Sequence, residues 1–510
     1  MVNRSTLLIA LILTLAVVPA SAQEPAAAKP AAAREKPAAP APEERTAVTR
    51  HHVVADDGRR IDYTATAGTL LLKKEDGTPR ASIFYIAYTR DGESDRTARP
   101  VTFSFNGGPG SSSVWLHLGV LGPRRVIMGD AGALPGPPWR VGANEQTLLD
   151  VSDLVFIDPV STGYSRAVPE EEAKSFHGLE EDVEAVGEFI RLWVTRNQRW
   201  GSPKYLIGES YGTTRAAALS DHLQGRHGMY LNGVMLISSI LDFQTARFET
   251  GNDLPYVLFL PTYTATAAYH GKLPTDLQQR ELRETLAEVE EFALGEYATA
   301  LMKGNDLPAA ESARIAERVS RYTGLSREYV ERSNLRIRID RFVKELLRDR
   351  RLTAGRLDSR FTGRDLDAAG ERYEYDPSYA AIQGSYTGAL LDYVRGDLRF
   401  ESDLPYEILT GRVRPWSYGN FENRYVNVAE HLRRAMAQNP GLRVFVASGY
   451  YDLATPYFAT DYTIDHLGYE PDYEDRVTTE YYEAGHMMYV HLPSLGKLGE
   501  DLERFILALP

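Results

Sequence analysis

Residues 205–212 of the chain read YLIGESYG. A short apolar run ends in a Gly-x-Ser-x-Gly pattern, and the next residues, TTRAAALSDHLQ over 213–224, have the composition of a helix. A strand, a tight turn and a helix in this order are typical of a nucleophile elbow, in which a strained turn exposes a serine hydroxyl. Glycines on both sides leave the room that such a turn needs. Because the pattern also occurs by chance, Ser210 becomes a candidate nucleophile only together with the rest of the chain.

Apolar segments on both sides of this turn predict a mostly parallel sheet covered by helices. The N-terminal part, 49–88, has short alternating runs that predict an antiparallel start to the sheet. Apolar residues at helical spacing over 179–193 predict a crossover helix that packs on the sheet. Alternating strands and helices are typical of α/β proteins with helices on both faces. Buried strands are expected at 101–105, 153–157, 205–207, 233–237 and 443–447.

Two later loops carry candidates for the base and the acid that a serine nucleophile needs. A serine hydroxyl is nearly unreactive without such partners. In α/β-hydrolases the acid and then the histidine follow the serine on late loops. Asp452 comes shortly after the last predicted strand, and His486 follows a glycine in a later loop. Position and order favour these two over the nearby alternatives Asp465, His466 and His491.

A Gly-rich loop, NGGPGSSS over 106–113, directly follows the strand predicted at 101–105. An oxyanion hole needs backbone N–H groups directed at the developing negative charge. The N–H of Tyr211, next to the serine, supplies one donor, and this loop is expected to supply the second. A phosphate-binding loop is the disfavoured alternative, because the lysine of the P-loop pattern is missing.

The character of the chain changes to helical between about 255 and 400. Thr275-x-x-Gln278 matches a capping box and predicts the start of a long helix, and further helices are expected at 309–323 and 326–350. Because this insertion lies between the elbow and the later catalytic candidates, we expect a lid over the site. A helical subdomain that only packs on the core is the alternative. The predicted domains are a signal peptide at 1–22, a tether at 23–45, the first part of an α/β-hydrolase core at 46–254, the helical insertion at 255–400 and the second part of the core at 401–510.

The N-terminus predicts export. Arg4, an apolar run over 7–18 and Ala20-Ser21-Ala22 match the three regions of a signal peptide, with an uncleaved membrane anchor as the alternative. The following Ala/Pro-rich residues are expected to be an extended, disordered tether. The chain has no cysteine, which excludes disulfides, cysteine nucleophiles and thiolate metal sites. We therefore expect a periplasmic or secreted bacterial protein with no stable membrane insertion after signal cleavage.

Charge and histidine spacing narrow the possible partners. The net charge of −13 argues against nucleic acid and against anionic membranes as partners. The sequence has no H-E-x-x-H pattern, and His486 and His491 are spaced off one helical face. We expect neither a metal ion nor another cofactor.

Five ordered blocks of the sequence resemble the serine carboxypeptidase family. They are 106–113, 158–165, the GESYG turn, the loop of Asp452 and the loop Gly485-His486-Met487. The resemblance implies an α/β-hydrolase fold and an exopeptidase that removes C-terminal residues from peptides or proteins through an acyl-enzyme. It also implies these roles: Ser210 as nucleophile, His486 as base, Asp452 as its partner, the N–H groups of Gly108 and Tyr211 as the oxyanion hole, and Asn106 and Glu209 as the site for the substrate's terminal carboxylate, with a proton held on Glu209.

Two positions depart from the family pattern. Ser111 stands where the family usually has a cysteine, in keeping with the absence of disulfides. Val120 stands where the family often has a second glutamate, so one member of the carboxylate clamp is missing, and Arg124 or Arg125 is a candidate to compensate. This departure keeps two alternatives open: an esterase, amidase or acyltransferase with the same triad, and a non-catalytic peptide-binding protein.

Overall fold

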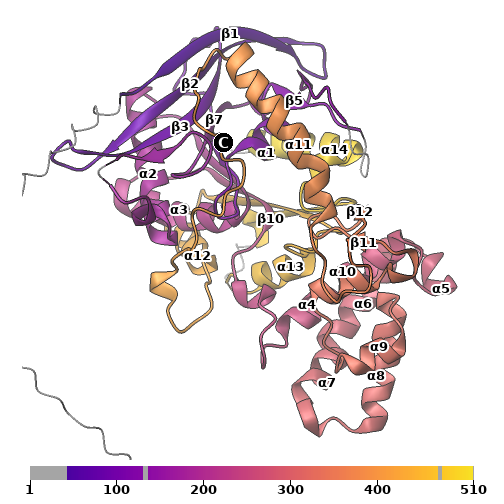
Figure 1. Ribbon diagram of the computed structural model, residues 1–510. Helices are drawn as coiled ribbons and strands as arrows, with labels where there is room; N and C mark the ends of the chain where they lie inside the picture. The colour runs from indigo at the N-terminus through magenta and orange to yellow at the C-terminus, as the bar shows by residue number, and fades with distance from the viewer. Residues whose placement is uncertain (1–42, 130–135, 170, 469–473, 509–510) are drawn as a thin grey trace, which may run out of the picture. The chain divides into compact units, whose positions relative to one another are not determined.

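A computed structural model of the chain describes residues 43–129, 136–169, 171–468 and 474–508. The predicted signal peptide and nearly all of the predicted tether lie outside these residues. Helices and strands carry the labels of Figure 1.

A ten-stranded sheet forms the core, with the strand order β1-β2-β3-β7-β4-β9-β10-β13-β14 and β8 paired to β3. The six strands from β7 to β14 run parallel, whereas β1, β2, β3 and β8 are antiparallel to their neighbours. The mostly parallel sheet and its antiparallel beginning confirm the predicted fold class. The strands are β1 (Thr46–Val54), β2 (Arg60–Lys73), β3 (Pro79–Arg90), β4 (Val101–Phe105), β7 (Asp153–Ile157), β8 (Arg166–Ala167), β9 (Lys204–Ser210), β10 (Gly233–Ser239), β13 (Arg443–Gly449) and β14 (Val477–Tyr482).

Helices cover both faces of this sheet (Figure 1). Every residue of β4 and β7 is buried, as expected for parallel strands covered on both sides. One face packs its apolar side chains against α2 (Leu179–Arg196), α3 (Tyr211–His227) and α12 (Ala429–Gln438). The opposite face packs against α1 (Val114–Leu116), α11 (Pro377–Asp392) and α14 (Leu492–Leu507). Between β13 and β14 the chain forms α13 (Tyr457–Asp465).

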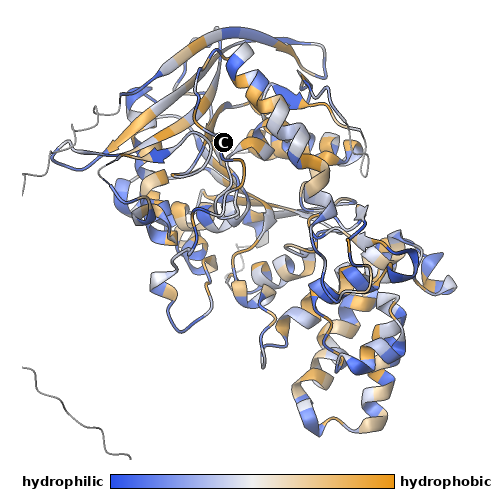
Figure 2. Ribbon diagram, in the orientation of Figure 1, coloured by the Kyte–Doolittle hydropathy of each residue, from blue (hydrophilic) through white to orange (hydrophobic). Residues whose placement is uncertain are grey.

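A separate bundle of helices has its own apolar core, formed by residues between Tyr256 and Ala354 together with Leu453. Figure 2 shows apolar and polar residues alternating around these helices, as in amphipathic helices that bury one face. Its helices are α4 (Leu254–Tyr269), α5 (Thr275–Gln278), α6 (Leu282–Phe292), α7 (Ala298–Lys303), α8 (Ala309–Thr323), α9 (Arg327–Arg332) and α10 (Ile339–Glu345).

Two helices of this bundle differ from the sequence prediction. The residues of the expected capping box form only the single turn α5, without a side-chain cap, and the long helix begins at Leu282. The helix expected over 326–350 is broken after α9, where Asn334 and Leu335 have φ of 50° and 63°. Tertiary contacts hold this break, since the hydroxyl of Tyr297 donates to the carbonyl of Leu335.

The second half of the helical insertion packs on the sheet and not in the bundle. Apolar residues of α11 belong to the core on the α14 side of the sheet. Two short antiparallel pairs complete the description: β5 (Arg124–Val126) with β6 (Val141–Ala143), and β11 (Thr353–Ala354) with β12 (Thr362–Gly363). The residues between β11 and β12 lead from the bundle back to the sheet.

Candidate active site

Ser210 is the last residue of β9 and directly precedes α3. Its φ of 60° and ψ of −129° lie in a region that side chains other than glycine rarely adopt, so the turn is strained. The flanking glycines are required, because a Cβ at Gly208 would lie 2.1 Å from the carbonyl oxygen of Gly212. The strand, strained turn and helix expected from the sequence are therefore present, with a half-buried serine at the turn.

His486 and Asp452 are joined directly. Nδ1 of His486 lies 2.7 Å from Oδ2 of Asp452, and both side chains are almost fully buried. Oδ1 of Asp452 accepts the backbone N–H groups of Ala454 and Thr455 at 2.7 and 3.0 Å. Burial disfavours the charged imidazole, but the charge and hydrogen bond of Asp452 outweigh burial and raise the pKa of His486. The pair can thus serve as a base whose orientation is fixed by a carboxylate.

The sheet order places the serine at the same edge as this pair. Strands β9, β10, β13 and β14 are consecutive and parallel, so the residues that follow them gather at one edge. Ser210 ends β9, Asp452 comes three residues after β13, and His486 four residues after β14. The hydroxyl of Ser238 on β10 donates to the carbonyl of His486 at 2.6 Å, which ties the histidine loop to the strand beside the elbow.

The Gly-rich loop after β4 lies against the backbone of the elbow. A Cβ at Gly107 would lie 2.4 Å from the backbone nitrogen of Tyr211, and one at Gly212 would lie 2.8 Å from the carbonyl oxygen of Phe105. Gly108, the next residue of the loop, has a φ of 107°. The arrangement brings the N–H groups of Gly108 and Tyr211 to the same edge of the sheet as Ser210.

Asn106 and Glu209 form a buried hydrogen-bonded pair. Nδ2 of Asn106 donates to Oε1 of Glu209 at 2.9 Å, and the hydroxyl of Tyr489 donates to Oε2 at 2.7 Å. Burial raises the pKa of Glu209 to about 7, although the charge of His486 and the two hydrogen bonds favour its ionised form. A carboxyl in this environment holds its proton in neutral to mildly acidic solution.

Arg215 of α3 holds the Asn106 end of this pair. Its guanidinium donates to the backbone carbonyl of Asn106 at 2.7 Å and forms a buried ion pair with Asp182 of α2, also at 2.7 Å. On the same helix the hydroxyl of Tyr211 accepts a hydrogen bond from the indole of Trp416 at 3.0 Å. Helix α3 is thus hydrogen-bonded to two neighbouring loops, the one that contains Asn106 and the one that contains Trp416.

The structure also reveals a segment that the sequence analysis missed, Arg356–Arg360, here named the strap. Its backbone contacts the loop of Asp452: the N–H of Leu453 donates to the carbonyl of Arg356 at 3.1 Å, and the N–H of Ser359 donates to the carbonyl of Tyr451 at 3.0 Å. The strap belongs to the insertion but acts as a brace for a core loop.

The strap also holds the loop of His486. The N–H of His486 donates to the carbonyl of Leu357 at 2.6 Å, and the N–H of Gly485 donates to Oδ2 of Asp358 at 3.1 Å. Asp358 is in turn paired with Arg360 at 2.6 Å. A Cβ at Gly485 would lie 2.5 Å from the Cβ of Asp358, which explains the glycine before the histidine. Nothing in the sequence pattern of the strap indicates these contacts.

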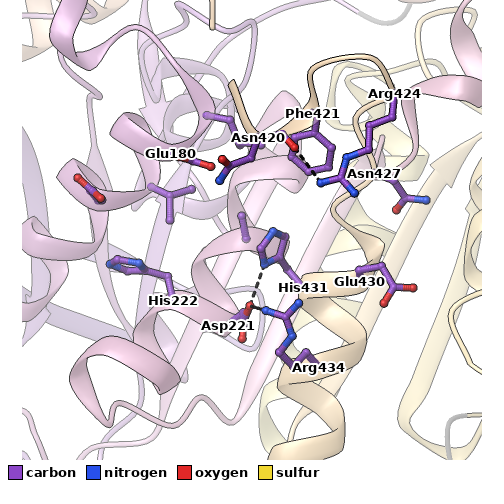
Figure 3. Close-up of a pocket in the computed structure, with 14 residues that line it drawn as sticks. Glu180, Asp221, His222, Asn420, Phe421, Arg424, Asn427, Glu430, His431 and Arg434 are labelled. Carbon is purple, nitrogen blue, oxygen red and sulfur yellow. Dashed lines mark hydrogen bonds and ion pairs between the residues drawn. The ribbon is translucent and has the colours of Figure 1, made fainter. Parts of the chain in front are cut away.

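A cavity of about 600 Å³ lies elsewhere, between α2, α3, α12 and the loop before α12 (Figure 3). In it Asp221 of α3 pairs with His431 and Arg434 of α12 at 2.8 and 2.7 Å. Asp221 is separated from Ser210 by three turns of α3, or roughly 16 Å at 1.5 Å per residue. This cavity is therefore distinct from the edge of the sheet where the catalytic candidates lie.

A family model described as serine carboxypeptidase matches residues 63–491. The chain belongs to the serine carboxypeptidase family. The match includes every predicted site residue from Asn106 to His486.

Individual relatives are more distant. Serine carboxypeptidase-like 29 of Arabidopsis thaliana is 28% identical over 29% of this chain and 31% of that protein. Pheromone-processing carboxypeptidase KEX1 of Yarrowia lipolytica is 25% identical over 39% of this chain and 30% of that protein. The chain thus spans less than a third of the length of each of these curated relatives.

The crystal structure of Kex1(delta)p, a prohormone-processing carboxypeptidase from Saccharomyces cerevisiae, has a similar fold. It matches with a TM-score of 0.54 and 17% identity, covering 87% of this chain and 91% of that one. At this identity the likeness shows the shared α/β-hydrolase fold.

The described residues contain neither a metal-binding cluster nor a helix that could span a membrane. No group of three or more His, Cys, Asp or Glu side chains in the described part of the chain is arranged to hold a metal ion. Across the same ranges, no helix is both long enough and apolar enough to cross a bilayer.

Proposed function

We propose that the protein is an exported serine carboxypeptidase that hydrolyses C-terminal peptide bonds through an acyl-enzyme on Ser210. A serine, a histidine and an aspartate at one sheet edge would serve an esterase equally well. The observation that carries the proposal is therefore the buried pair of Glu209 and Asn106, directly before the serine. A protonated carboxyl and an amide suit the recognition of a free terminal carboxylate.

In this mechanism His486 takes the proton of Ser210 through Nε2 while the serine oxygen bonds to the scissile carbonyl carbon. Asp452 keeps the Nδ1–H of the imidazole in place and stabilises the imidazolium. The N–H groups of Gly108 and Tyr211 stabilise the oxyanion. The imidazolium then protonates the leaving amine, so the C-terminal amino acid departs. Water attacks the acyl-enzyme with His486 again as base, and the serine is released.

Substrate selection depends on the state of Glu209. When it is protonated, its O–H donates to the terminal carboxylate, and the second N–H of the Asn106 amide is available to the same group. When it is ionised, it repels that carboxylate. Because the pKa of Glu209 is raised to about 7, binding of free-acid peptides is expected below that pH and should be lost above it.

Val120 supports a second candidate function. It is fully buried and apolar, and so contributes no polar group to a carboxylate site. An esterase, amidase or acyltransferase with the same triad would not need such a group.

One experiment separates these functions. An N-blocked peptide with a free C-terminal acid and its C-terminal amide would be incubated with the enzyme from about pH 4 to 8, followed by mass spectrometry. Stepwise loss of residues from the acid alone would support the carboxypeptidase. Equal attack on the amide, or cleavage of simple esters only, would contradict it. Ser210→Ala is the control, and it should lose turnover by several orders of magnitude while keeping the fold.

We also propose a location for the protein and a role for its helical insertion. Residues 1–22 and the absence of cysteine support export to the periplasm or exterior of a bacterium. We assign the insertion the role of a lid that is anchored to the site, because its strap bonds to both catalytic loops. The acidic net charge of −13 gives no support to nucleic acid as a partner.

A further inference from the structure

The carboxyl of Glu209 is held by two neutral donors. One is the amide of Asn106 on Oε1, and the other is the phenol of Tyr489 on Oε2, at 2.9 and 2.7 Å. All three side chains are buried, with 3% or less of each residue exposed. Tyr489 lies in the short 3-10 helix Met488–Val490 after the histidine loop, and no sequence motif gave it a role.

The ring of Tyr489 fits a space prepared for it by a neighbouring element. A Cβ at Gly119 would lie 2.4 Å from two carbons of this ring, so only glycine leaves room there. Gly119 and the buried, apolar Val120 belong to the π-helix His117–Leu121. The ring of Tyr489 therefore packs against this apolar helix, and its hydroxyl reaches the Glu209 carboxyl.

The other ionisable groups near Glu209 come from four elements. His486 and Asp452 act on it from the two catalytic loops, and Tyr489 from the 3-10 helix. Burial and the charge of Glu209 raise the pKa of Tyr386 on α11, and the charge of Arg125 opposes this rise. Among the described residues, no second carboxyl is hydrogen-bonded to Glu209. Asn106 and Tyr489 are thus the side chains hydrogen-bonded to the Glu209 carboxyl.

We propose that Tyr489 is a positioning residue for substrate binding: by donating to Oε2 it fixes the Glu209 carboxyl and sets the pH range in which that carboxyl can donate its proton to a peptide's terminal carboxylate. This inference rests on the proposed role of Glu209 in binding the terminal carboxylate of the substrate.

The sign of the effect follows from the direction of the hydrogen bond. A phenol that donates to a carboxylate stabilises the ionised form, whereas burial stabilises the neutral form. With both effects present, the pKa of Glu209 lies at about 7. Removal of the phenol hydroxyl leaves burial less opposed, so the pKa of Glu209 should rise. The loss of one hydrogen bond to a charged group corresponds to a shift of about one pH unit.

The test uses kcat/KM for an N-blocked dipeptide with a free C-terminal acid and for its methyl ester, between pH 5 and 9. The ratio of the two values cancels the titration of His486, which both substrates need. In the wild type this ratio should fall as pH rises through about 7, because KM for the acid increases. In Tyr489→Phe the fall should occur about one pH unit higher. The matched control is Tyr322→Phe, which removes a phenol that donates to Glu288 at 2.7 Å inside the helical bundle and should leave the midpoint unchanged.

The possible outcomes distinguish failure of the proposed role of Glu209 from failure of the proposed role of Tyr489. A wild-type ratio that shows no preference for the acid at any pH would overturn both the role of Glu209 and this inference. A wild-type preference with an unmoved midpoint in Tyr489→Phe would overturn the inference alone. If Tyr489→Phe does not fold, 3-fluorotyrosine at position 489 decides, because this stronger donor should move the midpoint to lower pH. An unchanged or higher midpoint with that residue would refute the role of Tyr489.

Discussion

Replacing Asp358 by alanine would show whether the strap positions His486, the proposed catalytic base. Asp358 is 5% exposed and its partner Arg360 is 8% exposed, so alanine leaves a guanidinium buried without its carboxylate. Removing one partner of a buried ion pair costs about 3–5 kcal/mol of folding free energy. The replacement also removes the acceptor for the N–H of Gly485, the residue before His486.

The catalytic effect should be separable from the loss of stability. Without its anchor the histidine loop can shift, and a misplacement of about 1 Å costs about 100-fold in rate. For Asp358→Ala we therefore expect kcat to fall by about 100-fold on a free-acid peptide, with little change in KM. The KM should hold because Glu209 and Asn106 do not contact the strap through any hydrogen bond among the described residues.

Asp153→Ala is the matched control for this experiment. Asp153 is also a buried carboxylate, paired with Arg99 and Arg199 at 2.8 and 2.5 Å. It is the first residue of β7, at the sheet edge opposite the catalytic loops. Chemical denaturation should show a comparable loss of stability for both variants, while only Asp358→Ala loses kcat. Equal kcat values in the two variants would refute the positioning role of the strap.

Three further predictions concern the site and the N-terminus. Glu209→Gln should make KM for free-acid peptides independent of pH through about 7, because an amide donor does not titrate. Wild-type binding, in contrast, is present below the raised pKa of Glu209 and lost above it. Parallel pH profiles of KM in the two enzymes would contradict this prediction. Gly485→Ala should lower both the stability and kcat, since the new Cβ would lie 2.5 Å from the Cβ of Asp358 in the strap. The control is Gly225→Ala, at an open position on α3, which should leave the rate unchanged and the melting temperature unchanged or higher. N-terminal sequencing of the exported protein should find Gln23 first, and retention of Met1 would contradict cleavage.

The sheet was predictable because its strands carry a simple signal. The strands β4 and β7 have the predicted boundaries, since both faces of each are covered and the apolar run therefore starts and stops with the strand. The turn at Ser210 was predictable for a local reason as well, because the two glycines that it needs, Gly208 and Gly212, are only four positions apart. The chain order then placed Asp452 and His486 on loops at the same edge, and the structure joins them.

The helical insertion was less predictable because tertiary contacts decide where its helices begin and end. The capping-box pattern at Thr275 has no cap hydrogen bond, and the long helix begins instead at Leu282, after Glu281. The strap and Tyr489 could not be predicted at all. The strap forms backbone hydrogen bonds with loops about a hundred residues away, and Tyr489 is hydrogen-bonded to a residue 280 positions earlier.

These contacts limit how the insertion can act as a lid. Leu453, the neighbour of Asp452, is fully buried in the apolar core of the helical bundle, and its N–H donates to the strap. A bundle that swung open as a rigid body would carry Leu453 with it and would pull the carboxylate away from His486. Since the proposed acid and base act only at hydrogen-bond distance, we expect substrate to reach Ser210 while the bundle stays in place. We therefore expect the insertion to stay fixed against the loops of Asp452 and His486, to which the strap is hydrogen-bonded.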